Sequence, residues 1–178
     1  MMTGMVIEVL LALSQLLDPA DDGTLRDDLK LAVERPAAYM EKHPGMRERS
    51  TDAANASLPW LALVDGLIAR GYAVELDHRD GGDETIHSLG KLKGHALFSA
   101  KTRDWMKRVG TKDMSTVDCL RKVAAHAEHD GLVIAVMDID SDSYVTLILG
   151  KDDYARATEL AARLGYILKD IREHDPNA

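Results

Sequence analysis

Cysteine is nearly absent from this sequence, with Cys119 the single one among 178 residues. One cysteine excludes a disulfide within the chain and a zinc site made of several thiolates. Aromatic residues are also scarce, at 4%, so aliphatic residues and eight methionines must fill most of the core. Because apolar residues still reach 46% and charged residues 29%, the composition is that of a folded globular protein.

Positive charge is in short supply. The chain has 22 lysines and arginines against 30 aspartates and glutamates, which gives a net charge of −8 and an isoelectric point near 5.3. A nucleic-acid-binding protein needs a concentrated positive face to replace the counterions of the phosphates, so we expect no nucleic-acid partner. The acidic balance instead suits a protein partner with a basic surface, since opposite potentials speed encounter.

Long apolar runs are missing as well. No segment reaches the length of about 18 apolar residues that a membrane-spanning helix requires. The apolar start, MMTGMVIEVLLALSQLLD, contains Glu8 and lacks the basic n-region and the small-residue cleavage site of a signal peptide. We therefore expect a cytoplasmic protein with no membrane partner. Phosphate loops, dinucleotide fingerprints and nucleophile elbows are also absent, so we expect no cofactor.

The N-terminal part has the pattern of a helical pair. Apolar residues recur at helical spacing over 6–17, and the DPADDG turn predicts the end of that helix. Thr24 is a candidate cap for a second helix, in which Pro36 marks a break or a kink. A polar loop of about fifteen residues, 43–57, follows and is longer than most connections in compact domains. We expect it to be a boundary or a mobile segment after a helical segment at 1–45.

Helices and strands follow one another in the rest of the chain. Ser57 is a candidate cap and Gly71 a stop for one helix, and Ser115 or Thr116 is a candidate cap for another. The segment 132–139 is apolar at nearly every position, as expected for an interior strand that is buried on both faces. We predict helices over 60–70, 83–92, 115–129 and 152–164, and strands over 72–77, 132–139, 144–149 and 166–171.

These elements predict an α+β fold. Their order indicates an antiparallel or mixed sheet of about four strands layered with helices, with the N-terminal helical pair packed against it. The length of 178 residues suffices for one ordinary domain and barely for two small ones. We expect 1–178 to form a single α+β domain with its sheet-containing core at 57–171.

Three aspartates, Asp138, Asp140 and Asp142, stand between two apolar runs in VIAVMDIDSDSYVTLIL. A helix–loop–helix calcium loop counted from Asp138 needs Gly at its sixth position and Glu at its twelfth, where Ser143 and Leu149 stand. An apolar strand running into D-x-D also resembles the nucleophile loop of haloacid-dehalogenase-type phosphatases. That superfamily needs a helix directly after the loop, whereas here a second strand follows.

Turn chemistry explains the same stretch better. Short aspartate and serine side chains bond their own backbone and tolerate tight dihedral angles. Pairing Ile139 with Tyr144 leaves 140–143 as the hairpin loop. Asp138 fits a turn less well, because it falls on an apolar strand face where a carboxylate needs donors or solvent. We expect Asp138 and Asp140 to project from the same sheet face, where they either hold a ligand or face water.

A second acidic stretch, ELDHRDGGDETIH, gathers six acidic or imidazole side chains after its leucine. No pair among them has a recognised metal-ligand spacing, and the two glycines in the middle indicate an exposed, solvated loop. We expect no metal site here, although a hard cation or zinc is the alternative. The six residues are Asp77, His78, Asp80, Asp83, Glu84 and His87.

Other candidates lie on the helical segments between these stretches. His126 and His129 end a predicted helix, where the helix dipole favours a cationic ring, and a metal there needs a third ligand. Cys119 stands beside Leu120 on the same helix, so we expect a packed thiol rather than a reactive one. Trp105, within the basic stretch KTRDWMKR, is either an interface anchor or a buried residue of a surface helix.

Two segments can be compared with known domains. In WLALVDGLIARGYAVELDHRD a Trp-led helix runs into a strand, and DIDSDSYVTLILGKDDYARATELAARLGYIL has an Asp-Ser-Asp-Ser-Tyr hairpin followed by a helix and a strand. Together they resemble a family of uncharacterised bacterial domains over residues 57–171. This resemblance implies no catalytic residues. Small acidic proteins of this kind are similar in character to immunity proteins, which neutralise toxins delivered between neighbouring cells.

We therefore expect a protein-binding module, and its concrete form is an immunity or inhibitor protein that occludes a toxin through an acidic surface. Two alternatives stay open. One is a metal-dependent hydrolase using Asp138 and Asp140, and the other is a regulatory or housekeeping domain without catalysis. The predicted binding residues are Asp77, Asp80, Asp83, Glu84, Trp105, Asp138, Asp140 and Asp142.

Overall fold

A four-stranded sheet forms the centre of the molecule. The computed structural model describes residues 2–46, 48 and 57–173. Every strand pair in the sheet is antiparallel, and the strand order is β1-β3-β2-β4. The strands are β1 (Ala73–Asp77), β2 (Leu132–Met137), β3 (Ser143–Gly150) and β4 (Leu168–Asp170).

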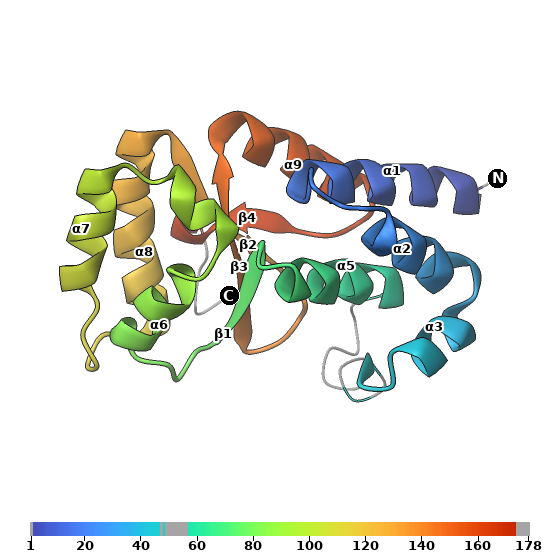
Figure 1. The fold of residues 1–178 in the computed structure, drawn as a ribbon, viewed down its shortest axis with the longest axis horizontal. Helices are drawn as coiled ribbons and strands as arrows, with labels where there is room; N and C mark the ends of the chain where they lie inside the picture. Colours follow the sequence, from blue (N-terminus) through green and yellow to red (C-terminus); the bar gives the residue numbers. More distant parts are fainter. Residues whose placement is uncertain (1, 47, 49–56, 174–178) are drawn as a thin grey trace.

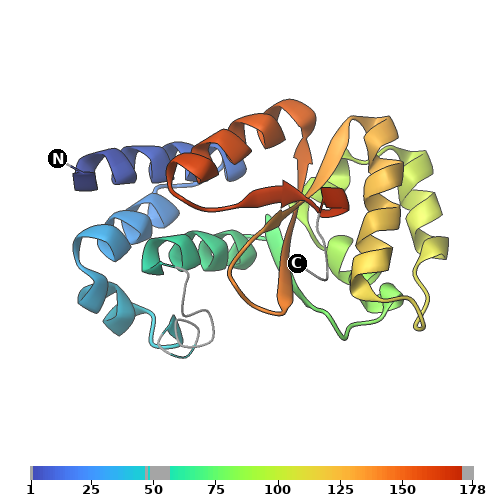
Figure 2. The ribbon, with the colours of Figure 1, turned by 180° about the vertical axis from the view of Figure 1, so that it is seen from behind.

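Helices lie on both sides of the sheet (Figures 1 and 2). One side has α1 (Met2–Leu17), α2 (Thr24–Glu34), α3 (Pro36–Lys42), α5 (Leu58–Ala69) and α9 (Lys151–Arg163). The other side has α6 (Gly82–Leu89), α7 (Ala100–Val109) and α8 (Thr116–Ala127). Short 3₁₀ turns are η1 (Lys93–Leu97), η2 (Glu128–Asp130) and η3 (Ile171–Glu173). No helix within 2–46 or 57–173 is long and apolar enough to cross a membrane.

The central strand β2 shows why its sequence is apolar throughout. Successive side chains of a strand point to opposite faces, so a strand covered on both faces buries every residue. Ala135 and Met137 join the core that contains Trp60 of α5, whereas Ile134 joins the core that contains Leu120 of α8. The predicted α+β fold with an antiparallel or mixed sheet of about four strands is therefore confirmed, and the sheet is antiparallel with four strands. The interior position of this strand is confirmed as well.

The register of the β2–β3 hairpin differs from the prediction. Met137 pairs with Val145, so the strands separate before Ile139 and the predicted pairing of Ile139 with Tyr144 is wrong. The connecting loop is 138–142 rather than 140–143. Ile139 forms no strand pair with β3. Its side chain is instead buried in the core on the α5 side.

The N-terminus of α2 is bonded by the Asp21 carboxylate rather than by the predicted cap, Thr24. Gly23, with a φ of 98°, is the N-cap of α2, and Thr24 is its first residue. The Asp21 carboxylate accepts hydrogen bonds from the backbone N–H groups of Leu25 and Arg26. Carboxylates near a helix N-terminus are stabilised by the unpaired N–H groups there.

The predicted break at Pro36 is confirmed, because α2 ends at Glu34 and α3 begins at Pro36. The polar loop predicted at 43–57 falls largely on residues 47 and 49–56, which lie outside the described residues. The structure therefore does not test its role.

Candidate functional site

The two acidic stretches of the sequence meet at one end of the sheet. β1 runs antiparallel to β3, and its last residue, Asp77, pairs with Ser143, the first residue of β3. The turn 77–80 therefore lies beside the loop 138–142, although about sixty residues separate them in the chain. Figure 1 shows both connections at the same end of the sheet. We call the five aspartates of these two segments the acidic sheet end; they are Asp77, Asp80, Asp138, Asp140 and Asp142.

Asp138 belongs to the loop and not to a strand face, which corrects the prediction. It follows the last residue of β2, and its side chain is exposed. Its Oδ1 accepts a 2.8 Å hydrogen bond from the backbone N–H of Asp140, which is an aspartate turn. Asp140 has a φ of 56°, a left-handed conformation that Asp tolerates better than most residues. Asp138 and Asp140 therefore do not project from a shared sheet face.

Serine side chains tie the acidic loop to β1. Ser143 Oγ donates to Glu75 Oε1 at 2.5 Å, and Ser141 Oγ and Ser143 Oγ are 2.8 Å apart. The Ser143 backbone N–H also donates to Ser141 Oγ. This stretch thus forms the turn that its composition predicts, with its short side chains bonded to one another and to their own backbone.

The turn 77–80 is also fixed from within. Asp77 Oδ1 accepts a 2.8 Å hydrogen bond from the backbone N–H of Arg79, and this bond lowers the pKa of Asp77 below its ordinary value. Asp80 Oδ2 accepts from the Asp77 backbone N–H at 3.0 Å. The buried Oγ1 of Thr116, at the start of α8, lies 2.8 Å from the carbonyl oxygens of both Asp77 and Asp80. The turn is therefore anchored to the helix behind it.

Asp83 and Glu84 are exposed in the first turn of α6, where the helix dipole favours negative charge. The glycines before them have a packing role. The Gly82 N–H donates to the carbonyls of Thr111 and Met114, and a Cβ at Gly82 would lie 2.9 Å from the Thr111 oxygen. The 110–114 loop therefore packs directly on the backbone of this turn.

The described residues contain no group of three or more His, Cys, Asp or Glu side chains arranged to hold a metal ion. Asp77 and Asp80 use side-chain oxygens to bond backbone N–H groups of their own turn. His78 lies 3.3 Å from Asp77, and both are exposed. The arrangement provides a surface of fixed negative charge rather than a closed coordination shell.

The remaining predicted residues lie elsewhere. Trp105 of α7 is half-buried and stacks on His126 of α8, with ring centroids 4.1 Å apart and planes 4° apart. His129 meets His126 edge-on at 5.9 Å. Both histidines stand near the end of α8, whereas the acidic sheet end lies at its start. Cys119 is fully buried, its Sγ donates to the Gly82 carbonyl, and burial raises its pKa to about 11, so its predicted packed role is confirmed.

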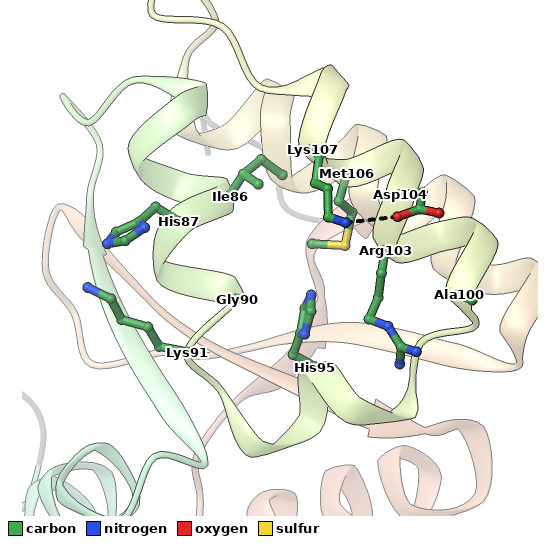
Figure 3. A pocket seen from close by; sticks show the side chains of 10 residues that line it. All are labelled: Ile86, His87, Gly90, Lys91, His95, Ala100, Arg103, Asp104, Met106 and Lys107. Carbon is green, nitrogen blue, oxygen red and sulfur yellow. Dashed lines mark hydrogen bonds and ion pairs between the residues drawn. The ribbon is translucent and has the colours of Figure 1, made fainter.

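Sequence reasoning missed a basic pocket between α6, η1 and α7 (Figure 3). Its volume is about 490 Å³. Residues from three consecutive elements contribute to it, so no local motif indicated it. The only sequence signal was the KTRDWMKR stretch, of which Arg103, Asp104, Met106 and Lys107 line the pocket.

Comparisons with known proteins assign the chain to a family but assign no activity to it. A family model described as Domain of unknown function (DUF6630) matches residues 9–171. Neither the comparison with curated proteins nor the comparison with solved structures finds a match. The matched range takes in the acidic sheet end and the basic pocket.

Proposed function

Because the chain belongs to the family described as Domain of unknown function (DUF6630), a description that assigns no activity, we propose a function from geometry. The chain acts as a protein-binding module, and its acidic sheet end docks on a basic surface of the partner. One observation carries the proposal: two acidic segments far apart in sequence converge at the same end of the sheet.

The charge at this end is concentrated and exposed. Segments 77–80 and 138–142 contain five aspartates and one permanent cation, Arg79. Exposed carboxylates keep most of their hydration, so placing them close together costs little free energy. Their summed electric field steers a cationic partner toward this end at low ionic strength. The complementary partner surface is one rich in arginine and lysine.

The shape of this end is set before binding. The Asp138 turn, the bond from Ser143 to Glu75 and the anchoring of the 77–80 turn by Thr116 all use groups within the chain. A preformed surface loses less conformational entropy on association than a mobile one. These contacts support an inhibitor that occludes a functional surface of its partner, and an immunity protein that neutralises a toxin is the concrete form.

Charge-neutral variants test the proposal without disturbing the fold. Asp140→Asn and Asp142→Asn remove two exposed charges from the acidic sheet end, and Glu84→Gln removes a third from the first turn of α6, which follows the 77–80 turn in the chain. Asp152→Asn with Glu159→Gln on α9 is the control, since these exposed residues lie on a helix outside the acidic sheet end. We expect the partner captured by the wild-type protein to be retained by the control and lost with the triple variant. We also expect a smaller salt dependence of association in the triple variant.

The immunity form needs a separate readout. The products of neighbouring genes are co-expressed with the wild-type protein or with the triple variant, and cell growth is recorded. Protection by the wild type that weakens in the triple variant supports it. If no neighbouring product is toxic or captured, the immunity form is wrong. If a partner binds the triple variant as tightly as the wild type, docking through the acidic sheet end is wrong.

The side-chain hydrogen bond of Asp138 does not favour the hydrolase alternative. The Asp138 carboxylate bonds the Asp140 backbone within a turn. A nucleophile with an acid–base partner requires the two side chains to converge on one reacting atom.

A further inference from the structure

A second, oppositely charged site lies on the helical layer of α6, α7 and α8. The pocket between α6, η1 and α7 has His87 and Lys91 on its α6 side and Arg103 and Lys107 on α7 (Figure 3). The imidazole of His95 stands between the two sides (Figure 3). This arrangement differs from the acidic sheet end in both place and charge.

The side chains that line the pocket carry a net positive charge, whereas the net charge of the whole chain is negative. Three permanent cations line it, Lys91, Arg103 and Lys107, against one acid, Asp104. Asp104 is engaged by Lys107, whose Nζ lies 2.9 Å from its Oδ1. Lys91 has no ion pair with any described residue, and its side chain is exposed at the rim, where its ammonium points toward His87 and away from His95 and Arg103 (Figure 3). A protein with a net charge of −8 therefore keeps an excess of positive charge at this one pocket.

The arginine is held in place by the backbone of the 3₁₀ turn. Arg103 Nη1 donates to the Phe98 carbonyl at 2.7 Å and lies 3.4 Å from the Ala96 carbonyl. A guanidinium has five N–H donors in a rigid fork, so donors remain for a ligand after these bonds. An arginine already fixed in position loses little conformational entropy when it binds an anion.

The floor and the central ring complete the site. Met106 is 2% exposed and, together with Ile86, gives the pocket an apolar base. Burial and the nearby Arg103 charge lower the pKa of His95, so its ring is neutral near neutral pH and offers one donor and one acceptor. A volume of about 490 Å³ is within the range of small-molecule sites.

We propose that this pocket binds a small organic phosphate, with the phosphate held by Arg103 and His95 and by Lys91 once its exposed side chain turns toward them, and with the organic part resting on Ile86 and Met106. A phosphate has several acceptor oxygens and suits a rim of donors from several side chains, whereas a single carboxylate satisfies fewer of them. The proposal concerns a different surface from the acidic sheet end and does not depend on the function proposed above.

Titration with inorganic phosphate and with phenyl phosphate tests it, with binding followed by the NMR signals of the His95 ring and the Met106 methyl group. Phosphate alone should move the His95 signals, and phenyl phosphate should bind more tightly and also move those of Met106. Lys91→Gln should weaken binding by about threefold to tenfold, and Arg103→Gln by more than about tenfold, because each removes a charge-assisted hydrogen bond.

Lys101→Gln is the matched control. It removes the same charge from α7 at an exposed position that does not line the pocket, so affinity should change by less than about twofold. If Arg103→Gln fails to fold, Lys91→Gln and the control decide the result. The proposal is overturned if the wild type does not respond to millimolar phosphate or phenyl phosphate, or if Lys91→Gln and Lys101→Gln weaken binding equally. It is also overturned if a poly-glutamate peptide binds the pocket and phenyl phosphate does not.

Discussion

The indole Nε1 of Trp60 donates a 2.8 Å hydrogen bond to the backbone carbonyl of Asp138, 78 residues further along the chain. Trp60 is fully buried and stacks on Tyr166 with ring centroids 4.4 Å apart. The backbone N–H of Asp138 donates in turn to the Ile167 carbonyl. Both backbone groups of Asp138 are therefore hydrogen-bonded, one to a core side chain and one to the chain just before β4, and the exposed acidic loop begins from a fixed point.

Trp60→Phe should release the start of this loop. The variant keeps a ring against Tyr166 but removes the indole N–H, which leaves the Asp138 carbonyl without its protein donor. We expect a loss of unfolding free energy of about 1–3 kcal/mol, measured by urea denaturation. Amide hydrogen exchange should also accelerate within 138–142. Trp105→Phe on α7 is the comparison, and unchanged exchange of the loop in Trp60→Phe would contradict the anchoring role.

Asp140 is sensitive to conformation as well as to charge. Its φ of 56° is unfavourable for most side chains and tolerated by Asp and Asn. Asp140→Ala and Asp140→Asn remove the same charge, yet only the alanine variant should lose stability, by about 1 kcal/mol relative to asparagine. Thermal unfolding of both variants measures the difference. Equal melting temperatures would show that the loop relaxes out of this conformation.

Gly110 has a fixed packing role beside the α6 turn. A Cβ at this position would lie 2.4 Å from the Gly82 carbonyl oxygen and 2.7 Å from Ile86 Cγ1. Gly110→Ala should therefore destabilise the protein by about 1–3 kcal/mol. Gly4→Ala is the control, because no described atom outside its own helix lies within 4 Å of the position of its Cβ, and alanine is the better helix former in α1. Calorimetry should show a lower melting temperature for the first variant and an unchanged or higher one for the second.

Cys119 should resist alkylation in the native state. Burial raises its pKa from 9.0 to about 11, so below pH 9 the folded protein holds almost no thiolate. Iodoacetamide should label it slowly in buffer and rapidly in urea. Since the folded pKa is the higher one, stability should be fully retained below pH 9 and fall as the pH rises toward 11. This fall should be smaller in Cys119→Ala, and rapid native labelling would show local opening of α8.

Asp130 should stabilise the folded protein at neutral pH and lose this contribution in acid, which is the reverse of the pH dependence expected for Cys119. Hydrogen bonds to the Thr102 side chain and to the Ser99 backbone N–H lower its pKa below 3.8. The contribution is present above pH 3.8 and is lost as the pH falls through the lower, folded pKa. In Asp130→Asn the stability should therefore decline less steeply between pH 4 and the acid transition. Circular dichroism at stepped pH values measures the two slopes, and parallel curves would exclude this contribution.

The sequence by itself determined those features that depend on local chemistry. The unbroken apolar run of β2 indicated an interior strand, and the predicted helix stop at Gly71 coincides with a positive φ angle of 75°. Ser115, one of the two predicted candidates, caps α8 by accepting the Asp118 N–H. Each of these features depends on neighbouring residues, so spacing and residue type were sufficient to predict it.

Only the tertiary structure decided the hairpin register and the grouping of side chains. Turn residues around Asp140 permit several registers, and the buried Ile139 together with the Trp60–Asp138 bond selects one of them. The pairing of Asp77 with Ser143 joins two acidic segments, and the basic pocket unites three elements. Contacts between residues distant in sequence arise from strand order and helix packing, and the local spacing of residue types specifies neither of these.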